Sequence, residues 1–141
     1  YCGAGTIGLS MAKSVGKVIG VEIIPEAIED AKINAELNGT KNARFICADA
    51  AAAAKTLESE GIRPDTVILD PPRKGCSRDV LETVADMNPE RVVYVSCDSA
   101  TLARDCKIFH ELGYAVQEYT AVDMFPRTTH CECVALLNRI K

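Results

Sequence analysis

The stretch RVVYVSCDSATLARD, residues 91–105, decides how the rest of the chain is interpreted. Its apolar part, residues 92–95, consists of the β-branched and aromatic residues typical of a buried parallel strand. The strand leads directly into Ser96, Cys97 and Asp98, which are turn and helix-cap residues. Ligands bind at the carboxyl ends of the strands in open α/β sheets, so Cys97 is predicted to lie at a functional edge.

Cys97 itself has two interpretations. A thiol just before a helix amino terminus experiences a partial positive charge, which stabilises the thiolate and favours a reactive cysteine. Most free cysteines, however, behave as small buried hydrophobic residues. The position of Cys97 alone leaves both interpretations open.

The composition suits one domain with a sizeable core. The chain has 141 residues, 48% of them hydrophobic, and its sequence shows no transmembrane span or secretory signal. The formal net charge of −4 argues against strong electrostatic binding of nucleic acid by this segment alone. A large polyanionic partner would need a local basic patch or residues outside this sequence.

The seven cysteines form no CxxC pair. The one close pair, Cys131 and Cys133, falls within a predicted strand, where both side chains would face the same side. This usage fits a reducing cytoplasm better than a disulfide scaffold or a zinc site. We therefore predict a cytoplasmic protein without a metal in this segment.

Residues 3–8, GAGTIG, match the pattern G-x-G-x-x-G and lead into a helix predicted over Ile7–Val15. Glycines such as Gly3 and Gly5 let the backbone turn tightly and approach a ligand closely. The predicted strand Lys17–Glu22 follows and ends in an acid about 20 residues after the first glycine, the usual partner of ribose hydroxyls. A dinucleotide site and an S-adenosylmethionine site look alike at this level.

Strands and helices then alternate roughly every 25 residues, which indicates βαβ units and a parallel sheet. The last two predicted strands have no helix between them and are expected to pair antiparallel. A parallel doubly wound sheet that finishes in a hairpin strand is typical of class I methyltransferases, whereas a dinucleotide-binding half more often keeps its helix. The predicted elements after Glu22 are helix Pro25–Leu37, strand Ala43–Cys47, a helix up to Gly61, strand Asp65–Asp70, helix Ser77–Met87, strand 92–95, helix Thr101–Leu112 and strands Tyr114–Val122 and Cys131–Asn138.

Acidic residues end two of the predicted strands. Asp49 could accept a hydrogen bond from an adenine amino group or could cap the next helix, and the sequence does not choose between these roles. Asp70 precedes two prolines, which stiffen the loop because they cannot continue a sheet ladder. Arg73 and Lys74 then give this loop positive charge suited to a phosphate, although a solvated turn with structural prolines is the plainer interpretation.

The connector of residues 123–130 returns to the same edge and brings Glu132 near Cys97. A lone glutamate in a strand is usually a solvent-facing residue. The apolar neighbours of Glu132 make that interpretation less ordinary here.

Four motifs together resemble one known family. In this order and spacing, they are similar to the bacterial RNA uracil-5 methyltransferases, especially those that act on 23S ribosomal RNA, over essentially all of the chain. The resemblance implies a class I methyltransferase fold, S-adenosylmethionine as methyl donor and 5-methyluridine as product. The motifs are YCGAGTIGL (1–9), DPPRKG (70–75), VYVSCDSATLARD (93–105) and MFPRTTHCECVALL (124–137).

The same resemblance assigns residues to roles. By motif position, Cys97 resembles the family nucleophile and Glu132 the base that removes a proton from the substrate. Arg73 or Lys74 would hold an RNA phosphate. The residues that fall where the family contacts the cofactor are Tyr1, Thr6, Glu22, Asp49 and Asp70, beside the glycines Gly3 and Gly5.

The chain departs from the family pattern in two places. The common Ser-Cys-Asn-Pro appears as residues 96–99, SCDS, so that Asp98 adds negative charge beside the nucleophile. Histidine is frequent where Arg127 stands. We expect a single catalytic domain, residues 1–141, cut from a longer protein. The upstream RNA-binding and central domains, and the cysteine cluster that holds an iron–sulfur centre in some members, lie outside this sequence.

The resemblance implies a covalent mechanism in which the Cys97 thiolate adds to carbon 6 of uracil, carbon 5 is methylated and Glu132 removes the carbon 5 proton. The expected partner is RNA, with no membrane and no obligate protein partner. Three alternatives remain: methylation of the transfer RNA T-loop uridine, an NAD-linked oxidoreductase half-domain, and a non-catalytic binding module that keeps the fold.

Overall fold

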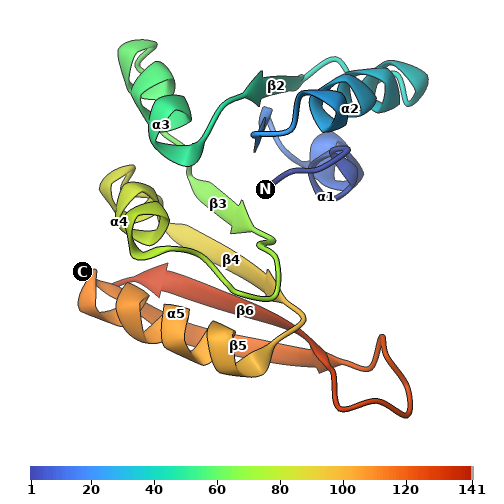
Figure 1. The fold of residues 1–141 in the computed structure, drawn as a ribbon. Helices are drawn as coiled ribbons and strands as arrows, with labels where there is room; N and C mark the ends of the chain where they lie inside the picture. The colour runs from blue at the N-terminus through green and yellow to red at the C-terminus, as the bar shows by residue number, and fades with distance from the viewer. Residues whose placement is uncertain (141) are drawn as a thin grey trace. The chain divides into compact units, whose positions relative to one another are not determined.

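The structure is a computed structural model that describes residues 1–140 (Figure 1). The chain divides into two compact units. The first, unit 1, is Tyr1–Lys55, and the second, unit 2, runs from Thr56 to the end of the described chain. The boundary falls within helix α3 (Ala50–Ser59). Within residues 1–140, no helix is both long and apolar enough to cross a membrane.

Unit 1 contains a parallel pair of strands, as the alternation of strands and helices predicts. In the sheet, Val18 lies opposite Ala43 and Glu22 lies opposite Cys47. The predicted bounds of α2 and β2 are confirmed. The elements are α1 (Thr6–Met11), a 3-10 turn (Ala12–Ser14), β1 (Val18–Glu22), α2 (Pro25–Leu37) and β2 (Ala43–Cys47).

Helix α1 is shorter than predicted. The amide of Asn42 donates hydrogen bonds to the carbonyls of Ala12 and Val15, at 2.8 and 2.9 Å. These bonds satisfy carbonyls at the helix end, so the chain tightens into a 3-10 turn instead of continuing as an α-helix. The amide comes from a distant segment, which the local sequence does not reveal.

Unit 2 contains a four-stranded sheet in the order β3-β4-β6-β5. Strands β3 and β4 are parallel, and β6 is antiparallel to both of its neighbours, β4 and β5. The predicted antiparallel pairing of the last two strands is therefore confirmed. The elements of this unit are β3 (Thr66–Leu69), α4 (Arg78–Asp86), β4 (Arg91–Ser96), α5 (Ser99–Glu111), β5 (Tyr114–Val122) and β6 (Glu132–Arg139).

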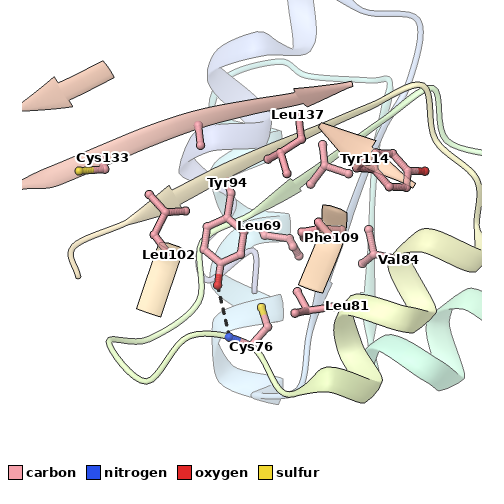
Figure 2. Packing of buried hydrophobic residues seen from close by; sticks show 12 residues of the cluster. Leu69, Cys76, Leu81, Val84, Tyr94, Leu102, Phe109, Tyr114, Cys133 and Leu137 are labelled. Carbon is pink, nitrogen blue, oxygen red and sulfur yellow. Dashed lines mark hydrogen bonds between the residues drawn. The ribbon is translucent and has the colours of Figure 1, made fainter. Parts of the chain in front are cut away.

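Alternate residues of the sheet in unit 2 build its hydrophobic core. Tyr94 and Leu137, from β4 and β6, are fully buried against residues of α4 and α5, as Figure 2 shows. Phe109 and Tyr114 pack edge to face with ring centroids 5.8 Å apart, and the hydroxyl of Tyr114 donates to the carbonyl of Pro89 at 2.8 Å. Both helices therefore cover the same face of this sheet.

Helix α5 begins at Ser99, two residues earlier than predicted. The cause is Asp98, whose carboxylate accepts a hydrogen bond from the backbone N–H of Thr101 at 2.9 Å and so caps the helix. Cys97 thus lies one residue beyond the end of β4 and two residues before α5.

Candidate functional site

The glycine loop at the start of unit 1 is tied to the end of β1. Gly3 has a φ of 50° and donates its backbone N–H to Oε2 of Glu22 at 3.1 Å. The other carboxylate oxygen of Glu22 accepts from the backbone N–H groups of Ile23 and Ile24 at 2.8 and 3.3 Å. A side chain at Gly3 would meet no atom within 4 Å, so the space beside the loop is open.

Glu22 is held in its ionised form by these contacts. Partial burial acts to raise its pKa, but the three backbone donors, from Gly3, Ile23 and Ile24, outweigh burial, and the pKa is lowered overall. An ionised carboxylate accepts hydrogen bonds only, and Oε2 retains capacity for a further donor. Glu22 therefore has the chemistry required to bind ribose hydroxyls.

Gly5 is needed for a different reason. Its φ is 81°, and an added Cβ would lie 3.1 Å from the ring of Phe45 and 3.2 Å from the Cβ of Ala31. The loop thus packs closely against α2 and β2 at this point. Thr6 is the exposed first residue of α1, and the terminal amino group of Tyr1 donates to the carbonyl of Val21 at 2.8 Å.

Asp49 takes the capping role that the sequence left open. Its carboxylate accepts from the backbone N–H of Ala52 at 2.7 Å, directly at the start of α3. The residue is exposed, and this bond does not use its second oxygen. The cap accounts for Asp49 structurally, and a contact with adenine stays a prediction.

In unit 2, the register of β4 and β6 relates Cys97 to Glu132. The pairing of β4 with β6 ends at Ser96 opposite Cys133. Cys97 follows Ser96 and Glu132 precedes Cys133, so both residues lie at the same end of this strand pair. Ser96 and Cys133 are both buried, and Cys133 belongs to the hydrophobic core of unit 2. Cys97 and Glu132 are both partly exposed.

Glu132 is influenced by a second carboxylate. Burial raises the pKa of Glu132, and the negative charge of Asp70 raises it further. Asp70 follows the last residue of β3, at the same edge of the sheet. A carboxyl group with a raised pKa near a reactive residue is suited to proton transfer.

Cys97 is more accessible than the two buried cysteines of unit 2, whereas Cys106 and Cys131 are partly exposed like Cys97. Cys76 and Cys133 are buried, and burial raises the pKa of both thiols. Cys97 is partly exposed at a strand end, as a reactive thiol needs to be. All seven cysteines are free, and residues 1–140 contain no cluster of three or more His, Cys, Asp or Glu side chains that could hold a metal.

Asp98, the departure from the family pattern, faces two groups that offset its charge. Backbone hydrogen bonding by Thr101 lowers the pKa of Asp98, and the nearby His130 contributes in the same direction. The negative charge beside Cys97 is therefore directed into the start of α5. Arg127, in the same connector as His130, is exposed and adopts a φ of 67°.

One group of polar residues was not predicted from the sequence: Tyr94, Arg104 and Asp105. Asp105 is fully buried, although its helix is otherwise apolar on that face. The available signal was its spacing, because Asp105 lies between Leu102 and Phe109 on the buried stripe of α5. Arg73 and Lys74 are exposed in the loop that these residues contact.

The fold is that of class I methyltransferases. A precorrin-6y C5,15-methyltransferase from Geobacter metallireducens shares it with a TM-score of 0.76 at only 14% identity over 98% of this chain and 77% of that one. The crystal structure of Pyrococcus abyssi tRNA (uracil-54, C5)-methyltransferase in complex with S-adenosyl-L-homocysteine aligns with a TM-score of 0.80 and 38% identity. That alignment covers 97% of this chain and 32% of the Pyrococcus chain.

Residues 1–140 match the model of the tRNA (uracil-5-)-methyltransferase family, and the chain belongs to that family. An uncharacterized RNA methyltransferase of Bacillus cereus is 55% identical over the whole chain, and one of Clostridium acetobutylicum is 51% identical over 99% of it. The chain spans 31% of the Bacillus protein and 30% of the Clostridium protein. The resemblance and the fold class inferred from the sequence are thus confirmed.

Proposed function

We propose that this chain is the catalytic part of an enzyme that methylates carbon 5 of a uridine in RNA. Membership of the uracil-5 methyltransferase family supports this proposal. The observation that carries it is the pairing of β4 with β6, which ends with Cys97 and Glu132 at the same end of the strand pair. An NAD-linked oxidoreductase would leave both residues without a role.

The methyl donor is S-adenosylmethionine, which supplies an electrophilic methyl group when bound. The related Pyrococcus enzyme was crystallised with S-adenosyl-L-homocysteine. In this chain, the ionised Glu22 fits the ribose hydroxyls, and the open space at Gly3 allows close approach to the backbone. Gly5, Thr6, Tyr1 and Asp49 complete the proposed set of cofactor-binding residues in unit 1, and the resemblance to the family also assigns Asp70 to the cofactor.

The thiolate of Cys97 adds to carbon 6 of the uracil ring. The new sulfur–carbon bond displaces the electrons of the ring double bond toward carbon 5 and the carbonyl oxygen at carbon 4. Carbon 5 then becomes nucleophilic enough to be methylated. The partial exposure of Cys97 leaves its sulfur accessible to a base that has left its stack.

Glu132 acts as the general base that completes the reaction. Its carboxylate removes the proton from carbon 5, the ring double bond re-forms, and the bond between carbon 6 and sulfur breaks to release the thiolate. The raised pKa of Glu132 strengthens its carboxylate as a proton acceptor near neutral pH. Asp70 contributes to this basicity through its negative charge.

We assign the RNA target to a uridine of 23S ribosomal RNA, because the sequences of the DPPRKG and TLARD segments are similar to those of the ribosomal group. The exposed Arg73 and Lys74 would contact its phosphate backbone. A transfer RNA target is the second candidate, favoured by the likeness to the Pyrococcus tRNA (uracil-54, C5)-methyltransferase.

The test is to delete the gene for the full-length protein and to map 5-methyluridine in both RNAs. The proposal predicts that one site in 23S ribosomal RNA loses its methyl group and that purified full-length protein restores it with S-adenosylmethionine. Loss from transfer RNA alone would select the second candidate. Unchanged 5-methyluridine in both RNAs, with no activity of the purified protein, would contradict the function.

A further inference from the structure

The loop between β3 and α4 is fastened to α5 by its backbone. The hydroxyl of Thr101 donates to the carbonyl of Arg73 at 3.0 Å. The guanidinium of Arg104 donates through Nη2 to the carbonyls of Lys74 and Cys76, at 2.9 and 3.2 Å. Side chains from the first two turns of α5 therefore satisfy three of the four carbonyls from Arg73 to Cys76.

Asp105 also binds this loop. Its Oδ2 accepts from the backbone N–H of Cys76 at 2.8 Å and from the hydroxyl of Tyr94 at 2.5 Å, and Oδ1 accepts from Nε of Arg104 at 2.8 Å. Figure 2 shows the hydroxyl of Tyr94 directed at the backbone nitrogen of Cys76. Both oxygens of the buried carboxylate are thus used, one on the loop and one on Arg104.

Gly75 shows how closely the loop fits this arrangement. An added Cβ would lie 2.6 Å from both Nη2 of Arg104 and Oδ2 of Asp105, and the φ of Gly75 is 71°. Such separations are not tolerated between real atoms, so only glycine allows the loop to lie on these two side chains. The residues Tyr94, Arg104 and Asp105 are called the loop clamp below.

Tyr94 belongs to the hydrophobic core, but the buried ion pair of Arg104 and Asp105 is not required to form such a core. A buried ion pair is often no more stabilising than hydrophobic residues of the same volume, because its desolvation is costly. Half of the side-chain surface of Arg104 is exposed, whereas Asp105 is fully buried. What the clamp gives is a single backbone conformation for residues 73–76, next to the helix that begins beside Cys97.

We propose that Arg104 and Asp105 are positioning residues for RNA, which act by fixing the backbone that carries Arg73 and Lys74. Because α5 begins just after Cys97, the clamp sets these two charges in a constant register with the nucleophile. The phosphate they hold then orients the target uridine. This inference rests on the proposed function and extends it to residues that touch neither substrate nor cofactor.

The experiment replaces Arg104 by lysine in the full-length protein, with Lys107→Ala as the control. Lysine keeps the charge of Arg104 but cannot bridge the two carbonyls and Asp105 at once. We expect the backbone amides of residues 74–76 to exchange hydrogen about tenfold faster, because the opening of the loop becomes easier. We expect KM for the RNA to rise about tenfold, while kcat stays within about threefold of its original value. Lys107→Ala removes an exposed charge one turn further along α5 and should change neither quantity.

A double-mutant cycle separates positioning from a general loss of stability. If Arg104 acts through Arg73 and Lys74, the substitution Arg104→Lys should change KM less than about twofold when Arg73 and Lys74 are already alanine. A tenfold rise in both backgrounds would overturn the inference, and so would unchanged amide exchange in Arg104→Lys. Wild-type protein that lacks methylation activity would instead remove the proposed function, with amide exchange still deciding whether the clamp holds the loop.

Discussion

The two units of the chain hold their functional loops by different means. In unit 1, the glycine loop is fixed by backbone N–H groups on Glu22 and by the close approach of Gly5 to Phe45. In unit 2, the loop after β3 is fixed by the side chains of Tyr94, Arg104 and Asp105. Both loops contain a glycine with a positive φ that packs closely, but only the loop in unit 2 is held by a fully buried carboxylate.

The two units also differ in the size of their buried side chains. The fully or nearly fully buried residues of unit 1 are small apart from Ile28, and they include Ala31. Unit 2 buries large side chains such as Tyr94 and Phe109 in one cluster. The proposed cofactor loop thus lies on a unit with small buried residues, whereas the proposed nucleophile, Cys97, follows a strand of a sheet with large buried side chains.

The largest expected effect concerns Cys97, the proposed nucleophile in unit 2. Cys97→Ala in the full-length protein should lower the rate of 5-methyluridine formation by more than about 10³-fold, because no other group can form the covalent bond to carbon 6. Cys106→Ala, a partly buried cysteine of α5, should retain activity within about threefold. The rates are measured with methyl-labelled S-adenosylmethionine, and equal rates for both variants would contradict the assignment.

The next effect sharpens the comparison of the cores. Phe109→Ala should reduce the free energy of unfolding by about 3–5 kcal/mol, since it empties a large volume in the packed cluster. Ala31→Gly in unit 1 should reduce it by about 1 kcal/mol, mainly through helix propensity. Urea denaturation gives both values, and a larger loss for Ala31→Gly would reverse the comparison.

Substitutions of Gly5 and Gly75 test the glycine loop of unit 1 and the loop after β3 separately. Gly5→Ala should weaken binding of S-adenosylhomocysteine about tenfold, since the left-handed conformation costs about 1–2 kcal/mol and Phe45 crowds the new methyl group. Gly75→Ala should instead raise KM for RNA and leave that binding within about twofold. Gly39 also has a positive φ, 61°, but an added Cβ there would meet no atom within 4 Å. Gly39→Ala therefore controls for backbone strain alone. Calorimetry and steady-state kinetics measure the two effects.

The smallest effect is a shift in pH dependence. In the proposed mechanism the carboxylate of Glu132 is the active form, so the rate should rise as pH passes upward through its pKa. Burial raises the pKa of Glu132 most, and the negative charge of Asp70 raises it further. Asp70→Asn should therefore move the acidic limb of the profile of kcat against pH to lower pH. A limb that stays in place or moves to higher pH would show that the two carboxylates do not interact.

Much of the fold was predictable because its signals are local. The apolar residues 92–95 and the break at residues 96–98 predicted β4 and the position of Cys97. The predicted end of α1 was wrong because Asn42, from a distant segment, caps this helix. The clamp was missed for the same reason, since the buried position of Asp105 depends on how the loop at Cys76 returns over α5. The sequence suggested that Glu132 approaches Cys97, and the pairing of β4 with β6 brings both residues to the same end of that strand pair.

The most direct test of the account is the covalent bond between RNA and Cys97. Full-length protein with Glu132→Gln is incubated with substrate RNA and S-adenosylmethionine, and its intact mass is measured under denaturing conditions. The account predicts a species with the mass of protein plus methylated RNA, and none when Cys97→Ala is added to Glu132→Gln. Free turnover by Glu132→Gln, or an adduct that survives Cys97→Ala, would contradict it.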